Sequence, residues 1–180
     1  LVMLVSSWAL HRATTFQAER SFRALHLVSS ATYSLSHGLN DAQKTMGIIT
    51  VLLYSTGYLS GPFAVPHWVA VSCYIAIALG TVTGGWKIIE TMGSRITKLS
   101  QHQGFSASLA GSIVLFGASV LGVPVSTTHT ITGAIVGAGT ARRASSVRWG
   151  VASNVVVAWI ITIPASAAIG AAFYLATRLF

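Results

Sequence analysis

Long apolar stretches separated by short polar segments run through the whole chain. The stretch from Leu99 to Ala141 contains no Lys, Arg, Asp or Glu. As a single helix it would be roughly 65 Å long, about twice the hydrocarbon core of a bilayer, so we expect it to fold back on itself. The stretch from Trp149 to Thr177 is also uncharged and is long enough for one tilted membrane helix with a bend at Pro164.

A third uncharged stretch lies between Lys44 and Lys87. Turn-forming residues interrupt its middle, so it predicts one helix that ends near Leu59 and a second helix from His67 to Trp86. The interrupting residues are Gly57, Gly61, Pro62 and Pro66.

The first part of the chain is expected to hold the end of a membrane helix, from Leu1 to Leu10, followed by a charged loop from His11 to Arg23. The segment from Ala24 to Leu59 would give roughly 54 Å of helix, which is long for one crossing. Two paths stay open for it, a single broken crossing and a hairpin. The charges at its ends favour the crossing.

A break in the helical pattern is predicted at Gly122 to Thr132. Pro124 has no N–H and disfavours helix at the residue before it. Hydroxyl side chains then open the next helix, namely Ser126, Thr127, Thr128 and Thr130. Because the first amides of a helix lack partners and carry partial positive charge, this break is predicted to bind an anion such as phosphate. A kink that only packs helices is the alternative interpretation.

A second break is predicted at Ser36 to Lys44, where polar side chains interrupt the apolar pattern. It contains Asp41, the only acidic residue within an apolar stretch, and an unpaired carboxylate at membrane depth is unfavourable by at least ~2.5 kcal/mol. Two interpretations remain open. Lys44 is its ion-pair partner on the same helix, or Asn40 and Asp41, with nearby hydroxyls, bind a cation.

The composition indicates an integral membrane protein. Of the 180 residues, 53% are hydrophobic and 8% are charged, and the mean hydropathy is +0.69. The net charge of +8 does not predict a nucleic-acid partner, because the basic residues form short clusters between apolar blocks. The single cysteine, Cys73, offers neither a disulfide framework nor a thiolate metal site.

The basic clusters are expected to face the cytoplasm. They are Arg12, Arg20 and Arg23, then Lys87, Arg95 and Lys98, then Arg142, Arg143 and Arg148. The last two clusters flank Gly104 to Ala141. We therefore expect this segment to enter and leave the membrane on one face, as a helical hairpin with its bend near Pro124 to His129.

The two predicted breaks together favour cation-coupled transport of an anion. An anion beside Asp41 is electrostatically unfavourable unless Na⁺, H⁺ or a divalent cation enters with it. His37 and His129 flank the breaks and are candidates to relay protons or to bind the anion. A hydrogen-bonded packing role is the alternative for each histidine.

Two motifs cover the predicted breaks, and they read Ser36-His37-Gly38-Leu39-Asn40-Asp41-Ala42-Gln43-Lys44-Thr45-Met46-Gly47 and Gly122-Val123-Pro124-Val125-Ser126-Thr127-Thr128-His129. Both resemble the second-half signatures of the inorganic phosphate transporter (PiT) family. The similarity extends through Lys87 to Lys98, Arg142 to Gly150 and Thr162 to Pro164, and so covers nearly the whole chain.

This resemblance implies an all-α integral membrane protein, one half of an inverted-repeat transporter with broken helices and a re-entrant helical hairpin. Residues 1–180 would be the C-terminal repeat of a longer, multi-pass protein of the cell inner membrane or plasma membrane, and its partners would be the lipid bilayer and the N-terminal repeat absent from this sequence. The protein would transport inorganic phosphate by symport with H⁺ or Na⁺. It would be neither an enzyme nor dependent on a cofactor, and a second copy of the chain is a further candidate partner.

The family's functional positions carry over to this sequence as five phosphate-binding residues, Asn40, Asp41, Ser126, Thr127 and Thr128. The resemblance also implies that a cation is bound at Asp41, with Asn40 and Thr127 beside it. One departure is that similar proteins usually have a Glu shortly after the Gly104-Phe105 pair, where this chain has Ser108.

Three alternative functions stay open at this stage. The first is transport of a neutral metal-phosphate complex or of another oxyanion such as sulfate or arsenate. The second is a non-transporting membrane subunit or receptor. The third is a membrane hydrolase that would use Ser126, His129 and Asp41, which requires the nucleophile and its base to lie within hydrogen-bond reach.

Overall fold

The computed structural model describes residues 1–178, without the side chain of Lys87, and over this range the chain forms helices and no strands. The elements are α1 (Val2–Ala9), α2 (Thr15–Ser55), α3 (His67–Glu90), a π-helical turn (Thr91–Arg95), α4 (Gln101–Val120), α5 (Thr127–Thr140), a 3₁₀ turn (Ala144–Ser146) and α6 (Trp149–Thr177). The prediction of an all-α fold is confirmed.

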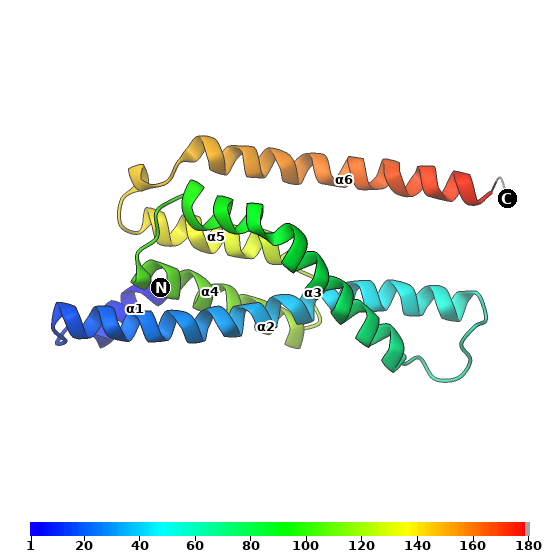
Figure 1. Ribbon diagram of the computed structural model, residues 1–180, viewed down its shortest axis with the longest axis horizontal. Helices are drawn as coiled ribbons and strands as arrows, with labels where there is room; N and C mark the ends of the chain where they lie inside the picture. Colours follow the sequence, from blue (N-terminus) through cyan, green and yellow to red (C-terminus); the bar gives the residue numbers. More distant parts are fainter. Residues whose placement is uncertain (179–180) are drawn as a thin grey trace.

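The helices form a long bundle with α4 near its centre. In Figure 1, α2 and α6 run along opposite edges, α4 and α5 lie between them, and α3 crosses at an angle. The most extensive contacts join α2 to α4, and the next join α4 to α5 and α2 to α3. By contrast, Ala152 is the one buried residue of α6, so the core lies among the other helices.

Three helices among the described residues are long and apolar enough to cross a membrane. They are His67–Trp86 within α3, Gln101–Val120 and Trp149–Thr177. The helices predicted at His67 to Trp86 and at Trp149 to Thr177 are confirmed, and the second has the predicted bounds. The structure therefore has the helices of a membrane protein.

The expected loop from His11 to Arg23 is wrong beyond Thr14, because α2 begins at Thr15. The cause is a capping box, in which the Thr14 hydroxyl accepts from the Gln17 amide at 3.4 Å and the Gln17 side chain accepts from the Thr14 amide at 3.2 Å. These bonds satisfy amides that a helix start leaves without partners. The polar residues of the segment lie on the first turns of a helix.

The predicted helix break at Ser36 to Lys44 is also wrong, because α2 runs through this segment without interruption. Its polar side chains bond to the helix that carries them: Ser36 Oγ donates to the Thr32 carbonyl at 2.8 Å, and Asn40 Nδ2 donates to the Ser36 carbonyl at 3.0 Å. Side-chain polarity therefore does not require the backbone to open. Of the two paths left open for Ala24 to Leu59, the hairpin is therefore excluded: the segment is a single helix as far as Ser55.

The break at Gly122 to Thr132 is present. α4 ends at Val120, Gly122 takes a φ of +67°, and α5 begins at Thr127. Only glycine adopts this left-handed conformation without strain, which explains why the chain reverses here. α4 and α5 then pack as an antiparallel hairpin whose two outer ends lie at the same end of the molecule (Figure 1).

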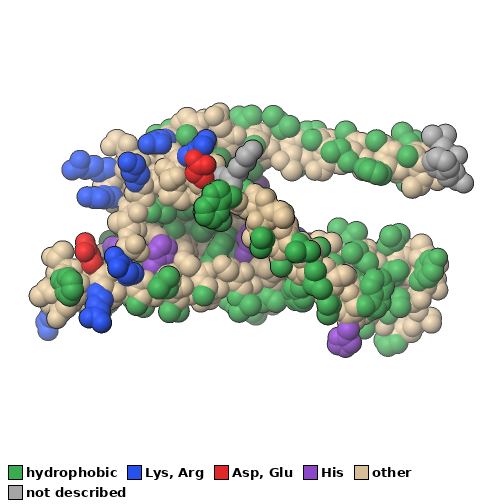
Figure 2. Space-filling model, in the orientation of Figure 1, with side chains coloured by type: hydrophobic (Ala, Val, Ile, Leu, Met, Phe, Trp, Pro, Cys, Tyr) green, Lys and Arg blue, Asp and Glu red, His purple; other side chains and the backbone are tan. Residues whose placement is uncertain are grey.

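Most of the visible basic side chains gather at one end of the molecule. On the face shown in Figure 2, most of the visible Lys and Arg side chains lie at the end where α2, α4 and α6 begin, as comparison with Figure 1 shows. The three charged connections therefore share one end of the bundle. The side of the membrane that this end faces stays a prediction.

Glycines allow α2 and α4 to approach closely. A Cβ atom added at Gly104 would lie 2.5 Å from His26 Cε1, and one added at Gly111 would lie 2.9 Å from Tyr33 Cε2. Both distances are too short for carbon atoms, so the aromatic rings of α2 lie directly against the backbone of α4. The position of the Tyr33 ring thus depends on the absence of a side chain at Gly111.

We expect Gly111→Ala to lower the unfolding free energy of the full-length protein by about 1–3 kcal/mol, because the added methyl group overlaps the Tyr33 ring. Gly117→Ala is the matched control on the same helix, since a Cβ there meets nothing within 4 Å. Thermal unfolding in detergent measures both. Equal melting temperatures for the two variants would contradict the close packing described here.

Candidate functional site

The first turn of α5 presents polar groups at the bend of the hairpin. Ser126 caps the helix, and its hydroxyl accepts a hydrogen bond from the His129 amide at 3.4 Å. The helix itself offers no acceptor to the amides of Thr127 and Thr128, which stand at the positive end of the helix dipole. This turn has the local chemistry of an anion site.

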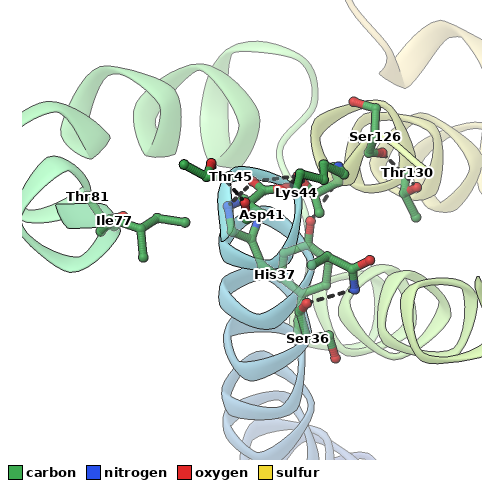
Figure 3. Close-up of polar contacts among 12 residues, drawn as sticks. Ser36, His37, Asp41, Lys44, Thr45, Ile77, Thr81, Ser126 and Thr130 are labelled. Atoms are coloured by element: carbon green, nitrogen blue, oxygen red, sulfur yellow. Dashed lines mark hydrogen bonds and ion pairs between the residues drawn. The ribbon is translucent and has the colours of Figure 1, made fainter. Parts of the chain in front are cut away.

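Asp41 of α2 lies against this turn. The buried Thr127 hydroxyl lies 3.2 Å from Asp41 Oδ1 and 3.1 Å from Oδ2 and donates to the carboxylate. On α2 itself, His37 Nε2 lies 3.2 Å from Oδ2 and Lys44 Nζ lies 3.4 Å from Oδ1 (Figure 3). The structure therefore brings Asp41 and Thr127 of the two predicted motifs into direct contact.

Lys44 has a second partner beyond α2. Its Nζ donates to the carbonyl of Val125 at 2.7 Å, in the connection between α4 and α5. The ion pair with Asp41 that the sequence offered as one interpretation is present. The contact with Val125 could not be inferred from the sequence, because no local spacing relates the two residues.

Tyr33 is a site residue that the sequence reasoning missed. Its hydroxyl donates to the Thr127 carbonyl at 3.1 Å, and its ring centroid lies 6.0 Å from that of His37. The available signal was spacing, because Tyr33, His37 and Asp41 are four residues apart and share one face of a helix. Together with Lys44, Tyr33 fixes the first turn of α5 to α2.

One side of Asp41 opens on a groove between α2 and α3 with a volume of about 440 Å³. The α2 wall includes Ala42, Thr45 and Ile49, and the α3 wall consists of Ser72, Cys73, Ala76 and Ile77. Figure 3 shows Ile77 on α3 facing the α2 residues. Asp41 lines this groove, and 31% of its side chain is exposed.

Other predicted site residues do not join the groups around Asp41. Asn40 is buried and bonds within α2. Thr128 is exposed in the first turn of α5. His129 is also exposed, and its ring centroid lies 3.9 Å from that of Trp159 on α6. Among the described residues, Ser126 and His129 therefore form no hydrolytic triad with Asp41.

Comparison with known proteins gives consistent matches over this chain. A family model described as "Phosphate transporter family" matches residues 2–170. The chain is 60% identical over 179 residues to the "Probable low-affinity inorganic phosphate transporter" of Rhizobium meliloti (strain 1021), covering 99% of this chain and 54% of that protein. The protein with the same name from Bacillus subtilis (strain 168) is 42% identical over 165 residues, covering 91% and 50% respectively.

The fold also matches a solved structure, named "The sodium-dependent phosphate transporter", with a TM-score of 0.80 and 34% sequence identity. The match covers 91% of this chain and 42% of that chain. This chain thus spans about half the length of the proteins it matches. All of them are named as transporters, which is a non-enzymatic function.

We expect Thr127→Val to lower the unfolding free energy by about 1–2 kcal/mol, because it removes the hydroxyl that donates to Asp41 while keeping the side-chain shape. Thr127→Ser keeps the donor and is the control. A double-mutant cycle of Thr127→Val with Asp41→Ala, which removes the acceptor, measured by thermal unfolding of the full-length protein, isolates the pair. Strictly additive effects would show that the two side chains do not interact.

Proposed function

Because this chain belongs to the phosphate transporter family, we propose that it forms half of a symporter that carries inorganic phosphate across the inner or plasma membrane together with a cation. The observation that carries this proposal is the contact of the Asp41 carboxylate with the Thr127 hydroxyl at 3.1–3.2 Å. A group suited to a cation and a helix start suited to an anion thereby lie side by side.

Phosphate is bound at the start of α5 in this proposal. The amides of Thr127 and Thr128 donate to its oxygens, the hydroxyls of the same turn add further donors, and the helix dipole favours the negative charge. The Lys44 ammonium, 2.7 Å from the Val125 carbonyl, adds a full positive charge next to this turn. Sulfate and arsenate have the same tetrahedral shape as phosphate, so the uptake experiment below uses them as competitors.

The coupling cation is bound at Asp41. A carboxylate so close to the phosphate repels it, and a cation on Asp41 removes the repulsion, which couples the two bindings. The groove between α2 and α3 gives the cation access to the carboxylate. The similar solved structure is named as sodium-dependent, and this name supports Na⁺ as the first coupling ion to test, with H⁺ as the second.

The site is completed by a second half of the protein in this proposal. The matched relatives are about twice as long as the region they share with this chain, and transporters built from inverted repeats bind their substrates where the repeats meet. The α4–α5 hairpin is then re-entrant, with both outer ends at the basic end and its bend at the repeat interface. The basic end is cytoplasmic by the positive-inside rule.

We expect Asp41→Asn in the full-length protein to reduce phosphate uptake driven by a Na⁺ or H⁺ gradient to background, because the amide lacks the charge that binds the cation. The measurement is radiolabelled phosphate uptake into proteoliposomes under each imposed gradient, with unlabelled sulfate and arsenate as competitors. Glu90→Gln is the matched control, since Glu90 forms an exposed pair with Arg95 at 2.8 Å. Uptake by Asp41→Asn at the wild-type rate would remove this carboxylate from the mechanism.

We expect single cysteines at Ser94 and Ser145, both exposed at the basic end, to react with impermeant reagents applied from the cytoplasm. A cysteine at the exposed Ser60, in the connection between α2 and α3, should react only from the opposite side. The measurement is labelling of a cysteine-free full-length background. Labelling of Ser94 and Ser145 from opposite sides would refute the re-entrant hairpin.

A further inference from the structure

We propose that Lys44 acts as a built-in cation that neutralises Asp41 in the absence of the coupling ion and turns to the anion when that ion binds. The inference rests on the proposed function, because it assigns the residue that links the cation site to the phosphate site. Lys44 lies between the two: its Nζ is 3.4 Å from Asp41 Oδ1 and 2.7 Å from the Val125 carbonyl.

The contacts of the Asp41 carboxylate indicate which of its partners a coupling ion displaces. Three groups surround Asp41 in the described structure: the Thr127 hydroxyl at 3.1–3.2 Å, His37 Nε2 at 3.2 Å and Lys44 Nζ at 3.4 Å. The lysine contact is the longest of the three. Among these three groups, the Lys44 ammonium is also the one with a permanent positive charge, which an entering cation repels. A coupling ion therefore displaces the ammonium with the least loss of hydrogen bonding.

The second contact of Lys44 determines where its charge goes. Val125 directly precedes the Ser126 cap, so an ammonium held by the Val125 carbonyl stays beside the first turn of α5. Once Asp41 is neutralised by the coupling ion, the charge of Lys44 is no longer offset. Cation binding thus increases the positive potential at the amides of Thr127 and Thr128, where phosphate is proposed to bind.

A purely structural role for Lys44 makes a different prediction. If the lysine only fastens α2 to the α4–α5 connection, its loss lowers the stability of the protein and leaves the dependence on cation and phosphate concentrations unchanged. If it competes with the coupling ion, its loss changes these two dependences in opposite directions. The two roles are therefore separable by transport measurements.

The test compares Lys44→Gln, Lys44→Arg and wild type in the full-length protein. Phosphate uptake is measured against the concentration of the coupling cation and against the concentration of phosphate. For Lys44→Gln we expect the half-saturating cation concentration to fall by about threefold or more, because the competing charge is gone, and the half-saturating phosphate concentration to rise by a similar factor. Lys44→Arg keeps the charge and should stay near wild type.

Lys98→Gln is the matched control, because Lys98 is exposed in the connection before α4 and its loss should change neither concentration. Unchanged values for Lys44→Gln, or a rise in its half-saturating cation concentration, would overturn the inference. Where uptake by this variant is too low to fit, stabilisation of the purified protein by the cation in thermal unfolding gives the same comparison. Failure of the proposed function would look different from failure of this inference, because the wild type itself would then show no gradient-driven phosphate uptake.

Discussion

The contact between α2 and the start of α5 depends on one constraint: the Asp41 carboxylate needs hydrogen-bonding and charged partners within a largely apolar bundle. A carboxylate without partners in apolar surroundings is strongly unfavourable, and Asp41 meets this constraint with donors from two separate parts of the chain, the Thr127 hydroxyl of α5 and the Lys44 ammonium of its own helix. Lys44 in turn holds the α4–α5 connection through Val125. Charge compensation therefore positions the start of α5 against α2.

An unbroken helix and a broken hairpin have complementary tasks in this site. α2 runs without interruption past this site and presents side chains to it, which are Tyr33, His37, Asp41 and Lys44. The hairpin reverses at Gly122 and presents backbone amides at the start of α5. Side chains thus supply full charges from one side, and the backbone supplies partial charges from the other, which is the arrangement that the proposed symport of an anion with a cation requires.

The sequence predicts most of the elements because a few residues dominate their physics. Uncharged length determines α6, turn residues bound α3, and Pro124 with the hydroxyls after it places the reversal before α5. The continuity of α2 could not be predicted, because Ser36 and Asn40 can satisfy either their own helix or a ligand, and only the structure shows that they bond to α2. Contacts of Tyr33 and Lys44 with the hairpin depend on packing between distant segments, which no local pattern encodes.

The continuity of α2 also sets the distance between Asp41 and the basic end. One continuous helix joins Arg23, at the basic end, to Asp41, and its rise separates the two residues by roughly 27 Å along the axis. The hydrocarbon layer is about 30 Å thick. The continuous helix therefore holds the carboxylate almost one hydrocarbon thickness away from the basic end.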